Sequence, residues 1–166
     1  MNWSDALQYA QEALLSMVQL GTAAILAGVV GWERESADKP AGFRTFMLVG
    51  LGAAAFTLLT MRLYAQVDAS GGEFGADPIR IISGVIGGLG FLGAGTIIQA
   101  GSTVKGITTA ATIWVTGSIG VACGLQFYGT AVGTVILSYG ILRLGLIAEL
   151  KHAESVKTKS RSEHER

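Results

Sequence analysis

Charged side chains at two places along a largely apolar chain are the residues whose types could do chemistry. The first group follows Trp32 and consists of Glu33, Arg34, Glu35, Asp38, Lys39 and Arg44, and the second is Asp77 with Arg80. Carboxylates beside guanidinium groups form ion pairs, and at a membrane boundary they also line routes for ions. Two interpretations of the first group stay open. It is a solvated, positively charged loop, or Glu33 and Arg34 turn inward and pair with groups at the ends of neighbouring helices.

The elements that must position these charges are membrane-spanning helices. Half of the 166 residues are hydrophobic and only 14% are charged, too few to coat a soluble domain of this size. We predict an all-α transmembrane helical bundle of about five spans. The expected spans are 13–32, 45–61, 81–104, 107–125 and 130–147, with the last two separated by a turn at Gly124–Gly129. Residues 62–77 are predicted to form a flexible acidic loop.

The distribution of Lys and Arg predicts the orientation of the bundle. No basic residue precedes Arg34, whereas three lie in the first loop, and five of the twelve fall in the last sixteen positions. Because cytoplasmic loops carry an excess of Lys and Arg, we expect the N-terminus outside and the C-terminus in the cytosol. Residues 1–148 then form the transmembrane domain, and 149–166 form a charged cytosolic tail that we predict to be disordered.

The third span has its own starting signal. Asp77 is a good N-cap, Pro78 suits the first helical position, and Arg80 lies one turn from Asp77 and can pair with it. In the predicted topology this pair lies on the opposite face from Glu33, about 30 Å away. One compact metal site therefore cannot include both Glu33 and Asp77.

Glycines and threonines supply the predicted contacts between helices. Small residues four apart let helix backbones approach closely in lipid. The third span contains Gly84, Gly87, Gly88, Gly90, Gly93 and Gly95, and later spans contain the pairs Gly120 with Gly124 and Gly129 with Gly133. Such faces serve packing within the bundle, a homo-oligomer or a partner helix. Thr108 and Thr109 open the fourth span on the cytosolic side, where their hydroxyls either satisfy free N–H groups of the helix or reach the Glu33 group.

Several motifs of soluble enzymes are absent or lack their context. Gly88 to Gly93 matches the dinucleotide pattern G-x-G-x-x-G, but it lies inside a predicted span instead of between a strand and a helix. The sequence contains no phosphate loop, H-E-x-x-H pair or G-x-S-x-G elbow. The single Cys123 lies in apolar sequence, which is typical of an inert thiol. We therefore predict neither an enzyme nor a nucleic-acid-binding protein.

Ordered motifs across most of the chain resemble the MgtC/SapB family of bacterial inner-membrane proteins. The matching segments are 33–35, 39–45, 48–53, 77–80, 90–95 and 106–114. The resemblance covers roughly Gly28 to Leu144. It implies a multi-pass protein of the bacterial inner membrane, linked to growth at low magnesium and to virulence. Some members of that family are implicated in restraining the ATP synthase. Longer members carry a further soluble domain after the spans, whereas a short charged tail follows them in this sequence.

Three classes of function follow, in order of preference. The first is a regulatory membrane protein that contacts another integral membrane protein through glycine-lined helix faces. The second is a transporter or channel for Mg²⁺ or another cation, in which Glu33 and Asp77 would line the route. An intramembrane enzyme is least favoured, because no nucleophile has an activating base. No resident cofactor is predicted, and Mg²⁺ enters only through the link to low magnesium that the resemblance implies.

Overall fold

Long helices make up almost all of the structure, a computed structural model that describes residues 2–69 and 78–145. The helices are α1 (Trp3–Ser36), α2 (Phe43–Ala69), α3 (Pro78–Ala94), α4 (Ile107–Gly124) and a fifth helix over 128–145, and a hairpin of β1 (Ile98–Ala100) and β2 (Thr103–Lys105) joins α3 to α4. Three of them, α1, α2 and α4, are long and apolar enough to cross a membrane. The predicted all-α membrane helical bundle is confirmed.

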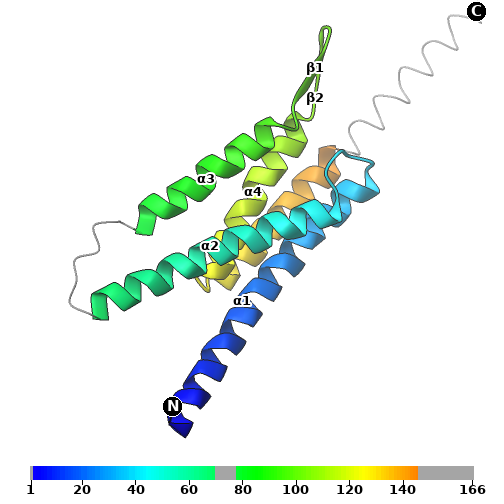
Figure 1. Cartoon of the computed structure of the whole chain (residues 1–166). Helices are drawn as coiled ribbons and strands as arrows, with labels where there is room; N and C mark the ends of the chain where they lie inside the picture. Colours follow the sequence, from blue (N-terminus) through cyan, green and yellow to red (C-terminus); the bar gives the residue numbers. More distant parts are fainter. Residues whose placement is uncertain (1, 70–77, 146–166) are drawn as a thin grey trace, which may run out of the picture.

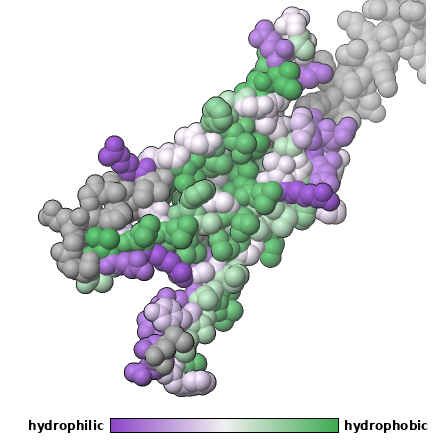
Figure 2. All heavy atoms as spheres, viewed as in Figure 1, coloured by the Kyte–Doolittle hydropathy of each residue, from purple (hydrophilic) through white to green (hydrophobic). Residues whose placement is uncertain are grey.

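The centre of the bundle is formed by α1, α2, α4 and the fifth helix. Its fully buried side chains include Phe46, Ile113 and Ile119. Figure 1 shows α3 beside α4, on the outer side of this group. Apolar residues dominate the middle of the visible face, and hydrophilic residues lie toward its two ends (Figure 2). This distribution is expected for a helical bundle whose middle lies in the hydrocarbon core of a bilayer.

Close backbone approach holds α2 between α1 and α4. A Cβ on Gly50 would lie 2.5 Å from the Ala27 methyl group of α1, and one on Gly120 of α4 would lie 2.3 Å from the Gly50 carbonyl oxygen. Gly124 meets Thr57 and Ala54 of α2 in the same way. These contacts follow the small-residue rule for helices in lipid.

The corner between α1 and α2 is closed by hydrogen bonds from both sides. Asp38 adopts a left-handed conformation with φ of 52°, and the Lys39 N–H donates to the Arg34 carbonyl over 3.0 Å, which ends α1. The Glu35 carboxylate accepts from the Phe43 N–H over 2.8 Å and so satisfies a free donor at the start of α2.

Two predicted boundaries are wrong. The expected loop from Arg62 is helical as far as Ala69, because α2 continues beyond its uncharged run and the Arg62 guanidinium donates to the Ser16 hydroxyl and the Glu12 carbonyl oxygen of α1. The third span does not reach 104, since α3 ends at Ala94 after about 25 Å. Residues 70–77, with the predicted Asp77 cap and its pairing with Arg80, lie outside the described residues.

The β-hairpin replaces the last part of the predicted third span. Its antiparallel register pairs Ile98 with Lys105 and Ala100 with Thr103. Gly101 has φ of 63° and precedes Ser102, which matches a two-residue turn with glycine first. Gly106 then has φ of 90°, and a Cβ there would lie within 2.0 Å of the Thr96 carbonyl oxygen. Only glycine fits where the hairpin enters α4.

The predicted turn between the fourth and fifth spans is confirmed. Helix α4 ends at Gly124, Gln126 takes a left-handed conformation with φ of 64°, and the next helix begins at residue 128. The buried Gln19 of α1 donates to the Gly124 carbonyl oxygen over 3.0 Å, which satisfies one of the free acceptors at this helix end. The predicted tail, 149–166, lies outside the described residues.

Candidate functional site

A buried ion pair in the last turn of α1 is the centre of the candidate site. Glu33 is 1% exposed and Arg34 is 3% exposed, and the Arg34 Nε lies 2.5 Å from the Glu33 Oε2. Trp32 points outward and packs edge-on against Phe43, with ring centroids 6.2 Å apart. The sequence left open a solvated loop or inward-turned side chains. In the structure, Glu33 and Arg34 face inward and pair with each other.

The pair leaves hydrogen-bonding capacity unused. The Glu33 Oε1 is buried and has no hydrogen-bond partner among the described residues. A buried carboxylate oxygen without a donor is costly, and a buried pair is stabilising only when its remaining atoms are also satisfied. This oxygen therefore keeps an unused capacity to accept one further hydrogen bond.

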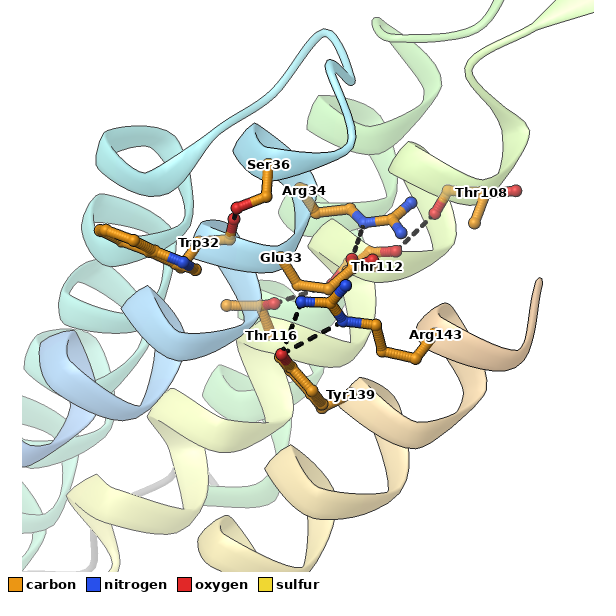
Figure 3. A network of polar contacts seen from close by, with 9 residues as sticks. All are labelled: Trp32, Glu33, Arg34, Ser36, Thr108, Thr112, Thr116, Tyr139 and Arg143. Atoms are coloured by element: carbon orange, nitrogen blue, oxygen red, sulfur yellow. Dashed lines mark hydrogen bonds and ion pairs between the residues drawn. The ribbon is translucent and has the colours of Figure 1, made fainter. Parts of the chain in front are cut away.

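Threonines of α4 face the ion pair. Thr109, Thr112 and Thr116 are buried on one side of the helix. The Thr112 hydroxyl donates to the Thr108 carbonyl oxygen over 2.6 Å, and the Thr116 hydroxyl donates to the Thr112 carbonyl oxygen over 2.8 Å. Because these hydroxyl protons are used within α4, the hydroxyl oxygens keep lone pairs for a further partner. Figure 3 shows Glu33 and Arg34 extending from α1 toward this part of α4.

The fifth helix adds Arg143 and Tyr139 to the network, which sequence reasoning missed. The Tyr139 hydroxyl accepts from the Arg143 Nε over 3.2 Å and from its Nη2 over 2.9 Å, and the guanidinium lies 5.3 Å from the Tyr139 ring centroid. Both side chains point from the fifth helix toward the Glu33 region (Figure 3). Their i, i+4 spacing was the signal that could have found them.

A polar cavity of about 720 Å³ opens beside the ion pair at the same end of the bundle. It brings together five of the residues singled out from the sequence, namely Arg34, Asp38, Lys39, Thr108 and Thr109, and adds Lys105. Thr108 is exposed, whereas Thr109 is buried. Arg80 lies in the first turn of α3, at the opposite end of the bundle from this cavity (Figure 1).

The predicted glycine set of α3 divides into two groups. A Cβ on Gly93 would lie 3.0 Å from the Ala110 carbonyl oxygen of α4, so this glycine lies against another helix, whereas Gly95 meets only carbonyl groups of its own segment. No described atom outside their own helix lies within 4 Å of a Cβ built at Gly84, Gly87, Gly88 or Gly90. The same is true of Gly129 and Gly133 in the fifth helix.

An apolar groove of about 740 Å³ separates α3 from α2. Its α3 wall includes Gly84 and Gly88, its α2 wall includes Gly52 and Phe56, and Arg44 lies at one end. The predicted boundary charge Arg44 is therefore part of the groove and does not line the polar cavity.

The described residues contain no cluster of three or more His, Cys, Asp or Glu that could hold a metal ion. Glu33 supplies one unpaired oxygen and the α4 threonines supply neutral oxygens. This donor set suits a transient contact with a cation better than a closed Mg²⁺ cage, because resident sites for hard cations use several carboxylate or carbonyl oxygens.

Fold and site together define an α-helical membrane protein with an ion pair buried at one end of its bundle. Residues 20–150 match the model of the MgtC family. The chain belongs to the MgtC family.

Relatives share most of this chain. A protein of Escherichia coli named "Putative magnesium transporter YhiD" is 36% identical over 148 residues, which cover 89% of this chain and 66% of that protein. "Protein MgtC" of Salmonella typhimurium is 39% identical over 122 residues, which cover 73% of this chain and 48% of that protein. The chain thus spans between about half and two thirds of these curated relatives. No solved structure matches it.

Proposed function

We propose that this chain is a multi-pass protein of the bacterial inner membrane that regulates magnesium homeostasis by contacting a transmembrane helix of another integral membrane protein. The observation that carries the proposal is the apolar groove between α2 and α3, with Gly84 and Gly88 on one wall and Gly52 on the other. Membership of the MgtC family and the magnesium-related name of the Escherichia coli relative support the link to magnesium. The proposal involves no enzymatic step.

Unsupported glycines in α3 favour an external helix as the occupant. A glycine inside a helix is less favourable than alanine by up to about 1 kcal/mol. Gly84, Gly87, Gly88 and Gly90 lie within seven positions, and a Cβ built at any of them would have no atom of another described element within 4 Å. Helices in lipid associate through close backbone contact at small residues, so a partner helix would provide the packing energy that offsets this cost.

The composition of the groove also suits a transmembrane helix. Its walls are apolar along Leu48, Val49 and Leu92, while the single basic residue Arg44 lies at the end with the polar cavity. A helix packed there would keep its apolar side chains among apolar neighbours and meet a charge only at its boundary with water.

Growth at low magnesium, combined with co-purification, tests the proposal. In a bacterial strain that lacks its own relative, the wild-type chain is expected to restore growth and to co-purify with one membrane partner. Gly88→Leu fills the groove and should abolish both effects while the amount of protein in the membrane stays unchanged. Gly133→Leu is the matched control, because a Cβ at Gly133 also meets nothing within 4 Å but lies on the fifth helix. Equal growth and equal partner recovery for Gly88→Leu and the wild type would refute the proposal.

A cation pathway is the second candidate, and the unpaired Glu33 Oε1 favours it. This buried oxygen faces α4, whose Thr112 and Thr116 hydroxyls retain acceptor lone pairs. The purified chain in liposomes should then move Mg²⁺, Glu33→Ala should abolish the flux, and Gly88→Leu should leave it intact. Absence of flux for every tested cation would eliminate this candidate without affecting the regulator proposal.

A further inference from the structure

The polar cavity at the start of α4 has the charge of an anion site. Among the described residues, Arg34, Lys39 and Lys105 line it against one lining carboxylate, Asp38. Even with the Glu33 carboxylate that pairs with Arg34, the cations outnumber the carboxylates. These side chains come from the end of α1, the corner after it and the hairpin, so the fold gathers them from three separate segments. The cavity therefore carries an excess of positive charge.

The uncapped start of α4 adds to this positive charge. Its N-cap is Gly106, which has no side chain to accept from the first turn. Within the described residues, the N–H groups of Ile107, Thr108 and Thr109 make no hydrogen bond, and the first helical bond is from the Ala110 N–H to the Gly106 carbonyl oxygen over 2.9 Å. Free N–H groups and the helix dipole favour a negative group at this end.

Arg34 gives independent evidence for a ligand. It is 3% exposed and lines the cavity, but its only hydrogen bond among the described residues uses Nε, which donates to Glu33. The two terminal nitrogens of the guanidinium are thus left without a partner in this part of the chain. A guanidinium fork that lines a cavity in this way matches the oxygens of a phosphate group.

An apolar crevice continues from the cavity along the bundle. It has a volume of about 150 Å³ and lies between α4 and the fifth helix, with Ala111 and Val115 on one side and Ile141 on the other. Thr108, Ile141 and Leu142 line both spaces, so the cavity and crevice adjoin. Since the eighteen residues of α4 rise about 27 Å, its first turn lies at a membrane boundary and the crevice leads into the hydrocarbon.

We propose that this site binds an anionic phospholipid, with its phosphate in the polar cavity and the upper part of an acyl chain in the crevice. A free phosphate would use the cavity alone, whereas the lipid uses both adjoining spaces. Basic pockets between transmembrane helices on the cytoplasmic side are known to hold anionic headgroups. The proposal is independent of the groove between α2 and α3, which shares no lining residue with the cavity or the crevice.

Thermal unfolding of the full chain in dodecyl maltoside micelles tests this assignment. Palmitoyl-oleoyl phosphatidylglycerol should raise the Tm in a saturable manner, because a ligand that binds only the folded state stabilises it. Palmitoyl-oleoyl phosphatidylcholine should not do so at equal concentration. Lys105→Gln removes an exposed lining cation and should weaken the apparent affinity for phosphatidylglycerol about fivefold.

Two variants and one soluble probe decide between the alternatives. Arg44→Gln is the matched control, since Arg44 is a basic residue at the same end that lines the other groove, and it should leave the affinity unchanged. Ala111→Leu fills the crevice and should weaken binding of phosphatidylglycerol. An equal loss for Lys105→Gln and Arg44→Gln, or equal effects of the two lipids, would overturn the proposal. A Tm rise with inorganic phosphate alone, as large as that with the lipid, would overturn the lipid assignment in favour of a free anion.

Discussion

Removal of one partner of the Glu33–Arg34 pair should be far more harmful than removal of both. Glu33→Leu leaves a buried guanidinium without its carboxylate, and Arg34→Met leaves a buried carboxylate without its cation. Because both residues are at most 3% exposed, the charge that remains loses its partner at a largely buried position. Each single change is expected to lower the free energy of unfolding by about 3–5 kcal/mol, the range for breaking a buried pair.

The double variant separates pairing from simple packing. With Glu33→Leu and Arg34→Met together, no buried charge remains at the pair, and the stability should return to within about 2 kcal/mol of the wild type. Unfolding would be followed by titration of sodium dodecyl sulfate into dodecyl maltoside micelles. The solvent-accessible Arg143–Tyr139 contact is the comparison, and Tyr139→Phe should cost less than about 1 kcal/mol. Single variants that each lose less than about 1 kcal/mol, or a double variant whose loss equals the sum of the two, would refute the buried-pair reasoning.

Three further experiments test the helix packing and the turn after α4. Gly120→Ala should lose about 1–3 kcal/mol of stability in the same titration, because the new Cβ would lie 2.3 Å from the Gly50 carbonyl oxygen, whereas Gly52→Ala has open space and should lose nothing. Gln126→Gly should gain about 0.5–1 kcal/mol, since φ of 64° suits glycine, and an unchanged midpoint would contradict this. Cys123 is fully buried, so maleimide should label it only after unfolding, and rapid labelling of the folded protein would show that the α2–α4 contact opens.

The sequence predicted the positions of the apolar helices, because such helices require long runs without charged residues. Uncharged runs located α1, α2 and α4, and the glycines at 124 and 129 located the turn before the fifth helix. The same criterion missed the hairpin, because residues 96–104 are uncharged and a Gly-Ser turn inside an apolar run resembles membrane sequence. It also ended α2 too early at Arg62, since a helix can continue past the boundary of the apolar layer into water.

The candidate site was predictable only in its local part. The position of Glu33 and Arg34 directly after an apolar run allowed inward-facing side chains, and both are buried. The expected pairing with groups of neighbouring helices differs from the structure, in which the two residues pair with each other. The meeting of Arg34 with Lys105 in one cavity depends on how the hairpin folds back, which no spacing along the chain encodes. The lack of a neighbouring helix at Gly84 and Gly88 was likewise not predictable. A pair of small residues four positions apart indicates close packing, but it does not indicate which helix packs there.

The closed corner between α1 and α2 determines which parts of the bundle can adjust. Hydrogen bonds at Asp38 and Glu35 fix the angle between these two helices, and the glycine contacts then attach α4 to α2. By contrast, α3 packs mainly against α4 and is connected to it by a short hairpin. If a partner helix enters the groove as proposed, it would contact one wall, α2, that is fixed on both sides, and one wall, α3, that is attached mainly to α4. A change in the tilt of α3 would then let the groove accept helices of different diameter.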